Sequence, residues 1–233
     1  MKQTFTCLLP FYNEGQRILR VLSIVTQVEG LTEIIAVDDG STDGVNQLIK
    51  ENFPQVKVVR SEQNLGKAEA VALGLQHVTS QYVFLCDADL KNLRVAEIKL
   101  GLKKIEQAGV EMIIFNRVEP NDSYQLTSNL MSRTGIACLF SGDRILSRAD
   151  LARVMQQKPQ AYQLEAAINQ YMIEQGRQVG WIESSAKNHY RYAELGLKDT
   201  FLKYWQMMVS ILRWTGPAGL IYQLVRWDLD EVT

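Results

Sequence analysis

Asp87 and Asp89 stand directly after residues 82–86, a run apolar enough to form a strand buried on both faces. In an extended segment residues two apart point the same way, so both carboxylates can approach one cation. Mg²⁺ and Mn²⁺ take such oxygen ligands and keep coordination places for phosphate. Asp-X-Asp alone is a weak motif, and the alternative is that one carboxylate caps the helix beginning near Arg94 while the other is solvated. The position after a buried strand favours a metal–diphosphate site.

Asp38 and Asp39 form a second acidic pair, which follows the apolar run of residues 34–37. Gly40, Ser41 and Thr42 come next and suit a capped turn. A turn explains two consecutive acids at a strand end less well. Carboxylates accept hydrogen bonds from the hydroxyl and imide N–H groups of a nucleoside. We therefore expect Asp38 or Asp39 to contact a nucleoside, with the capped turn as the alternative.

Lys67 follows Gly66 and stands in the first turn of a helix predicted over residues 67–78. A cation is unfavourable at that end of a helix, which weakens a purely structural explanation and indicates a nearby anion. A solvated lysine is the alternative. The spacing of a nucleotide P-loop is missing, since Ala68 occupies the place of the metal-binding hydroxyl, and a dinucleotide fingerprint is missing as well.

Short apolar runs alternate with amphipathic helical patterns through the first half of the chain. This alternation predicts βαβ units, so the fold class is α/β, with a mostly parallel sheet flanked by helices. Ligands of such sheets bind beyond the carboxyl ends of the strands, where the polar residues above lie. The expected strands are 4–9, 34–37, 56–60, 82–86, 112–115, 144–146 and 178–182, and the expected helices are 16–28, 45–51, 67–78, 94–107, 126–134, 149–155 and 164–174.

The composition is that of a globular protein and argues against a nucleic-acid-binding protein. The chain has 233 residues, 46% of them hydrophobic, which suffices for one globule with a sizeable core. Lys and Arg number 25 against 26 Asp and Glu, and no basic stripe appears, so a nucleic acid is a poor partner. The three cysteines lie in apolar segments and suit reduced, buried thiols, and no secretory leader is expected. We therefore expect a cytoplasmic protein.

Four motifs resemble, in order and spacing, the nucleotide-sugar-binding half of glycosyltransferase family 2, which has the GT-A fold. The resemblance covers about residues 4–116 and implies a metal-dependent enzyme that moves a sugar from a UDP- or GDP-sugar donor to an acceptor. The motifs are LPFYNE at 9–14, VDDGSTD at 37–43, NLGKAEA at 64–70 and DADL at 87–90.

The resemblance also implies a set of site residues. Asp87 and Asp89 would hold Mg²⁺ or Mn²⁺, and His189, in a polar loop after the last predicted strand, would be a third ligand, as in several GT-A enzymes. A loop histidine without a ligand is the alternative. The expected nucleotide-sugar contacts are Pro10, Tyr12, Glu14, Asp38, Asp39, Lys67, Asp87 and Arg144.

The second half of the chain matches the family more faintly. Glu165 resembles the family's acceptor-side acid, so with Asp89 it is our candidate catalytic residue, acting as general base towards an acceptor hydroxyl. The alternative is an acid that stabilises a helix N-terminus. A phosphate acceptor needs no base, and Glu165 would then orient a sugar hydroxyl. We expect a single-addition enzyme rather than a polymerase, although residues 223–227 (QLVRW) match the Gln-x-x-Arg-Trp pattern of processive synthases.

Residues 201–227 combine apolar side chains with Trp205, Trp214 and Trp227 and with scattered cations. Such a segment suits an amphipathic helix at a membrane interface, near a lipid-linked acceptor such as a polyprenyl phosphate. It equally suits packing on its own domain or in a homodimer, and a small-molecule acceptor stays open.

These observations predict a catalytic domain over residues 1–200, with a donor half at 1–116 and an acceptor half at 117–200, and a C-terminal helical segment at 201–233. The alternatives to a transferase are a degenerate GT-A domain that acts as a binding module, and a nucleotidyltransferase that makes the nucleotide sugar.

Overall fold

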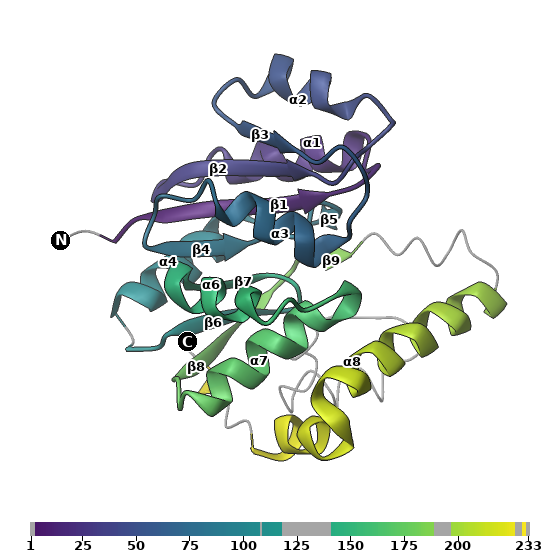
Figure 1. Cartoon of the computed structure of the whole chain (residues 1–233). Coiled ribbons are helices and arrows are strands. Elements are labelled where there is room, and N and C mark those ends of the chain that lie inside the picture. Colours follow the sequence, from purple (N-terminus) through teal and green to yellow (C-terminus); the bar gives the residue numbers. More distant parts are fainter. Residues whose placement is uncertain (1–2, 108, 118–140, 189–196, 227–229, 232–233) are drawn as a thin grey trace.

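The computed structural model describes residues 3–107, 109–117, 141–188, 197–226 and 230–231. Its main sheet has the strand order β10-β8-β6-β7-β4-β1-β2-β3 (Figure 1). All neighbouring strands are parallel except at β7, which confirms the predicted α/β class. The strands of this sheet are β1 (Phe5–Phe11), β2 (Leu31–Asp38), β3 (Lys57–Arg60), β4 (Tyr82–Leu85), β6 (Met112–Arg117), β7 (Arg144–Ser147), β8 (Val179–Ser184) and β10 (Asp230–Glu231).

Helices cover both faces of the sheet because its strands are apolar on both sides. Along β1, Leu8 belongs to one buried cluster and Leu9 to the other, as the alternation of side chains in a strand requires. Helices α1 (Gln16–Val25), α2 (Val45–Asn52) and α4 (Val95–Gln107) pack with Leu9. Helices α3 (Lys67–Leu75), α6 (Arg148–Gln156) and α7 (Leu164–Glu174) pack with Leu8.

The predicted elements agree with the observed ones except at their ends. Helix α7 has the predicted bounds, whereas α1 ends at Val25 and α3 at Leu75, earlier than predicted. The predicted helix at 126–134 and Cys138 lie outside the described residues. Cys7 and Cys86 are buried free thiols, as expected.

Strand β7 runs antiparallel to both of its neighbours. Ile145 pairs with Phe84 of β4 on one side and with Ile113 of β6 on the other. Because of its reversed direction, β7 begins at the edge of the sheet where β4 and β6 end. The sequence predicts a strand at 144–146 but does not predict this position, which brings Asp143 beside the ends of two parallel strands.

Helix α8 (Leu197–Arg226) contains most of the predicted C-terminal segment and lies along α7 (Figure 1). Its Ile211 is buried, and Trp214 packs against the cluster that holds Leu8. The side chain of Trp205, by contrast, is 60% exposed. The helix therefore packs on its own domain, as one alternative proposed, and its contact with a membrane or a second subunit stays a prediction. Within the described residues we find no helix with the length and apolar character needed to span a bilayer.

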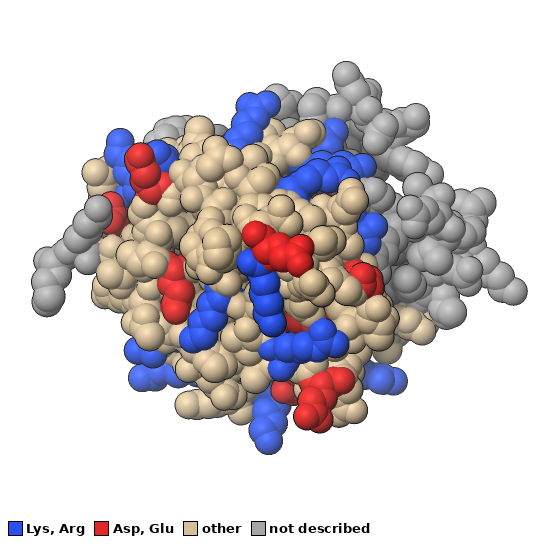
Figure 2. Space-filling view, turned by 90° about the horizontal axis from the view of Figure 1, so that it is seen from above, with Lys and Arg blue, Asp and Glu red and all other residues tan. Residues whose placement is uncertain are grey.

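Figure 2 shows the face of the molecule that lies at the top of Figure 1. Lys and Arg side chains are interspersed there with Asp and Glu. The described residues of that face form no continuous basic stripe of the kind that a nucleic-acid backbone requires.

Gly40, in the turn after β2, has a backbone φ of 79°, and a Cβ there would lie 2.6 Å from the backbone carbon of Gln63. A methyl group must therefore move a backbone as well as adopt a left-handed conformation. We expect Gly40→Ala to lower the free energy of unfolding by about 3 kcal/mol. Gly44→Ala is the matched control, because φ is 75° with nothing within 4 Å, and should cost about 1 kcal/mol. Urea denaturation measures both, and equal losses would contradict a role for the close approach.

Candidate active site

Lys67, at the first position of α3, joins two carboxylates that are far apart in sequence. Its Nζ lies 2.7 Å from Oδ1 of Asp87, just after β4, and 2.7 Å from Oε1 of Glu165, in the first turn of α7. The backbone of Gly142 lies against this pair, since a Cβ there would be 2.6 Å from the Lys67 ammonium and from both Asp87 oxygens. The predicted anion next to Lys67 is thus supplied by the protein itself.

Arg117, the last residue of β6, holds the other side of Asp87. Its Nη2 lies 2.8 Å from Asp87 Oδ2, and its Nε donates to Asp143 Oδ2 at 2.9 Å. The backbone N–H of Asp87 in turn donates to Asp143 Oδ1 at 2.8 Å. Arg117 is not among the site residues predicted from the sequence. The signal was present, because Arg117 ends an apolar strand in the same way that Asp87 follows one.

The two cations fix the charge of Asp87. Burial alone would raise the pKa of this carboxyl, but Lys67 and Arg117 outweigh burial and hold the pKa well below its usual range. Burial would lower the pKa of Lys67, but Asp87 and Glu165 outweigh that effect and raise it. Asp87 and Lys67 are therefore both charged across the physiological pH range.

Asp89 has a different environment. Burial, together with the negative charges of Asp87 and Glu14, raises the pKa of Asp89 to about 6. A divalent cation would reverse this effect, and carboxylate oxygens are ligands that Mg²⁺ and Mn²⁺ accept. The donor chemistry therefore fits the predicted metal, although the residues that the structure describes contain no cluster of three or more His, Cys, Asp or Glu side chains that could hold one.

A small antiparallel ribbon begins at Leu90, the residue that follows Asp89. Strand β5 (Leu90–Lys91) pairs with β9 (Lys187–Asn188), and Leu90 lies opposite Asn188. The ribbon brings the chain that precedes His189 to the residue that follows Asp89. His189 itself lies outside the described residues, so its role as a ligand stays a prediction.

The carboxylates of Asp38 and Asp39 both form hydrogen bonds or ion pairs with other residues of the chain. Asp38 accepts the backbone N–H of Ser41 at 2.8 Å and pairs with Arg60 at 3.0 Å, which is the capped-turn arrangement. Asp39 accepts the backbone N–H groups of Leu65 at 2.9 Å and Gly66 at 2.7 Å. Asp39 thus holds the loop that leads into Lys67. A nucleoside contact from either residue stays a prediction.

The loop after β1 lies at the same edge of the sheet. Asn13 accepts the backbone N–H of Thr42 at 2.8 Å, which ties the loops after β1 and β2 together. Glu14 pairs with Arg17 at 2.7 Å and lies close enough to Asp89 to influence its pKa. Tyr12 is exposed and Pro10 is partly exposed. The structure thus gathers this predicted motif beside the acidic strand ends.

Arg144 is held inside the domain by hydrogen bonds. Its side chain is fully buried and donates to Asn169 Oδ1 at 2.8 Å and to the backbone oxygen of Ser141. It also reaches the backbone oxygen of Glu165 at 3.5 Å. Arg144 thus fixes the start of α7, and with it the backbone of Glu165. A contact of Arg144 with the nucleotide sugar stays a prediction.

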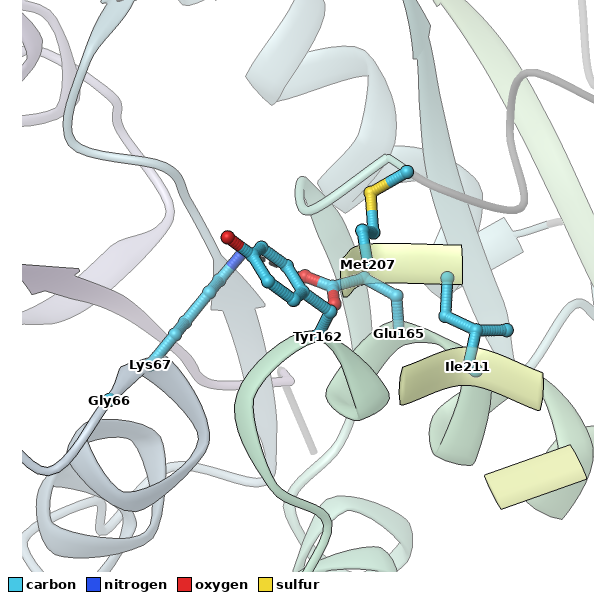
Figure 3. A pocket seen from close by; sticks show the side chains of 7 residues that line it. Gly66, Lys67, Tyr162, Glu165, Met207 and Ile211 are labelled. Carbon is cyan, nitrogen blue, oxygen red and sulfur yellow. Dashed lines mark hydrogen bonds and ion pairs between the residues drawn. The ribbon is translucent and has the colours of Figure 1, made fainter. Parts of the chain in front are cut away.

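A cavity of about 440 Å³ lies beside Lys67 and Glu165 (Figure 3). It extends from these charged groups towards α8, and its walls come from α3, from α7 with the short helix η2 (Ala161–Gln163), and from α8. Its lining residues are Gly66, Lys67, Tyr162, Glu165, Ala166, Met207 and Ile211.

Comparisons with known proteins identify the family of this chain. Residues 6–158 match the model of glycosyl transferase family 2. The chain is 34% identical over 119 residues to a dolichyl-phosphate beta-glucosyltransferase of Saccharomyces cerevisiae, a match that covers 45% of this chain and 36% of that protein. It is 30% identical over 132 residues to a putative glycosyltransferase of Bacillus subtilis, over 53% of this chain and 40% of that protein. The chain therefore spans less than half the length of these two relatives.

Among solved structures, the chain resembles glucosyl-3-phosphoglycerate synthase of Mycobacterium tuberculosis in complex with Mn²⁺, UDP and glucosyl-3-phosphoglycerate. The TM-score is 0.70 at 20% identity, over 91% of this chain and 79% of that one. At this identity the likeness shows a shared fold. The family model spans more than half of the 233 residues, which confirms the resemblance noted in the sequence: the chain belongs to glycosyl transferase family 2 and has the GT-A fold.

Proposed function

We propose that this protein transfers a sugar from a UDP- or GDP-sugar to an acceptor by single addition, with the help of Mg²⁺ or Mn²⁺. The observation that supports the proposal best is the position of Lys67, 2.7 Å from both Asp87 and Glu165. Asp87 follows a strand in the half of the chain that matches the donor motifs, and Glu165 lies in the first turn of a helix of the other half. Donor-side and acceptor-side carboxylates thus meet at one point.

In this proposal Asp87, Asp89 and His189 would hold the metal. When bound, the cation stabilises the negative charge that develops on the departing diphosphate. The negative charges of Asp87 and Glu14 close to Asp89 support a cation beside it. The structurally similar synthase of Mycobacterium tuberculosis has been solved with Mn²⁺ and UDP, and also with Mg²⁺ and UDP.

Glu165 is the proposed general base. In a direct displacement, the acceptor hydroxyl gives its proton to the Glu165 carboxylate while its oxygen bonds to the anomeric carbon, and the bond from that carbon to the diphosphate oxygen breaks. Lys67 supplies positive charge on the leaving-group side of this exchange. With a phosphate acceptor the proton step falls away, and Glu165 orients a sugar hydroxyl.

Pro10, Tyr12, Glu14, Asp38 and Asp39 are proposed to surround the nucleoside. Their loops converge at the edge of the sheet that carries Asp87, through the bonds of Asn13 and Asp39 described above. We further propose a cytoplasmic location. The exposed surface of α8 would supply peripheral contact with a membrane or with a second copy.

Arg117 is proposed to keep Asp87 ionised and oriented while no donor is bound. It is the cation that both Asp87 and Asp143 share, and Asp143 is buried. Removal of Arg117 would leave the largely buried carboxylates of Asp87 and Asp143 without the cation that they share.

The first prediction from this proposal concerns the metal. UDP or GDP should bind at least about tenfold more tightly with Mg²⁺ or Mn²⁺ than with a chelator, because the diphosphate charge needs the cation. Titration calorimetry measures this, and Asp89→Asn should remove most of the difference. Equal affinities with and without chelator would remove the metal from the proposal. Release of free nucleoside diphosphate from the donor without an acceptor would separate a transferase from a non-catalytic binding module.

Glu165→Gln should lower kcat by about 10²–10⁴ with a hydroxyl acceptor, because the amide cannot take the proton, while the affinity for the donor stays unchanged. Glu174→Gln, an exposed residue at the other end of the same helix, is the matched control and should leave kcat unchanged. Steady-state kinetics decide the matter. A loss below tenfold in a folded Glu165→Gln variant would make Glu165 an orienting or capping residue.

Arg117→Met should lower the free energy of unfolding by about 3–5 kcal/mol near pH 8, because Asp87 and Asp143 lose their shared cation. Arg117 lowers the folded-state pKa of both acids, so both pKa values rise when it is removed; the loss of stability is then full at pH values above the new folded-state pKa values and shrinks as pH falls through them. Lys99→Met removes an exposed ion pair and should cost at most about 1 kcal/mol. Urea denaturation at several pH values tests this, and a loss that does not depend on pH would contradict the explanation.

A further inference from the structure

The cavity beside Lys67 and Glu165 has two chemically different walls. Lys67 and Glu165 form the charged wall, and their ion pair links it to Asp87. Met207 and Ile211, both from α8, form an apolar wall, and Tyr162 stands beside Lys67 (Figure 3). One continuous space therefore connects the proposed reacting groups with an apolar surface.

The apolar wall is held in place by contacts of α8 with the domain. The Gln163 side chain donates to the backbone oxygen of Ser210 at 3.2 Å, and the Gln223 side chain donates to that of Ala166 at 3.3 Å. Ile211 is 3% exposed, whereas Tyr162 is 42% exposed and Met207 is partly exposed. These contacts fix the position of the wall, and part of it faces the cavity.

The position of this wall in the chain points to the acceptor. The family model ends at residue 158, and Tyr162, Met207 and Ile211 all lie beyond it. The features proposed to bind the donor belong to the part that matches the family model. Five of the seven residues that line the cavity lie beyond that part, which is where a preference for one acceptor over another would be encoded.

We propose that the acceptor is an amphiphile. Its accepting group, a hydroxyl or a phosphate, lies at Lys67 and Glu165, and its aliphatic part lies against Met207, Ile211 and Tyr162. A wholly polar acceptor would leave its hydroxyls without partners along Met207 and Ile211, which is costly. An aliphatic chain removes that apolar surface from water instead, and a flexible methionine adapts to its shape. The proposal rests on the proposed function, since it places the acceptor at Glu165.

The experiment compares acceptors that differ only in their apolar part, using the full chain with Mn²⁺ and UDP-glucose or GDP-mannose as donor. The hydroxyl arm compares glucose with its methyl, butyl and octyl glycosides, and the phosphate arm compares inorganic phosphate with geranyl and farnesyl phosphate. In the arm that supports transfer, kcat/KM should rise with chain length, by about threefold to fourfold for each methylene that becomes buried. The arm that responds identifies the accepting group.

Met207→Gln should lower kcat/KM about tenfold for the long-chain acceptor and leave the headgroup acceptor and donor affinity unchanged. Ile221→Gln is the matched control, because Ile221 lies in the same C-terminal segment beyond the kink at Gly216, is 60% exposed and is not among the cavity residues. Tyr162→Ala repeats the test should Met207→Gln fail to fold.

Equal kcat/KM for acceptors with and without the aliphatic part would overturn the proposal of an amphiphilic acceptor. Equal losses of kcat/KM in Met207→Gln and Ile221→Gln would overturn it too. A weaker donor affinity in Met207→Gln would assign the cavity to the donor and would also overturn the proposal. Transfer to none of these acceptors, with metal-dependent donor hydrolysis intact, would overturn the amphiphile and leave the proposed function standing. Loss of donor binding and hydrolysis altogether would overturn both.

Discussion

The Lys67 ammonium between Asp87 and Glu165 is the interaction on which the rest of this site depends. Two carboxylates this close in a partly buried site repel each other strongly unless a cation lies between them. The cation is delivered by a loop whose backbone N–H groups at Leu65 and Gly66 are bound by Asp39. Asp39, which the sequence predicts to contact a nucleoside, thus positions Lys67 in this structure. Gly142 leaves the space that this ion pair occupies.

Strand β7 supports the same site from two sides. Asp143 and Arg144 are consecutive residues at its start, and their side chains serve different neighbours. Asp143 binds Arg117 and the backbone of Asp87, whereas Arg144 binds Asn169 and the start of α7. The antiparallel direction of β7 is what allows this, because a parallel strand at that place would begin at the opposite edge of the sheet. One short strand therefore sets the positions of both the donor-side and the acceptor-side carboxylate.

Helix α8 links the apolar C-terminal sequence to this chemistry. A helix so rich in apolar and aromatic residues needs a surface to cover, and α7 offers one. Only part of α8 is covered, since Trp205, Ile221 and Tyr222 stay exposed. The same helix thus completes a cavity next to Glu165 and presents apolar side chains to the outside.

The sequence by itself determined the parallel α/β sheet, its flanking helices and the strand ends that carry Asp38, Asp87 and Asp89. It could do so because side-chain periodicity and turn chemistry are local, and because strands that are apolar on both faces require helices on both sides. The start of α7, and with it the place of Glu165 in the chain, follows from the same kind of pattern.

Only the tertiary structure decided which of these groups meet. Lys67 and Glu165 are 98 positions apart, and nothing local to either residue indicates the other. The insertion of β7 between β4 and β6 and the burial of Arg144 depend on how the whole sheet is ordered. The choice of α7 as the surface that α8 covers depends equally on packing across the domain. Periodicity reports that a residue is buried or exposed, but its partner is set by the free energy of the complete packed chain.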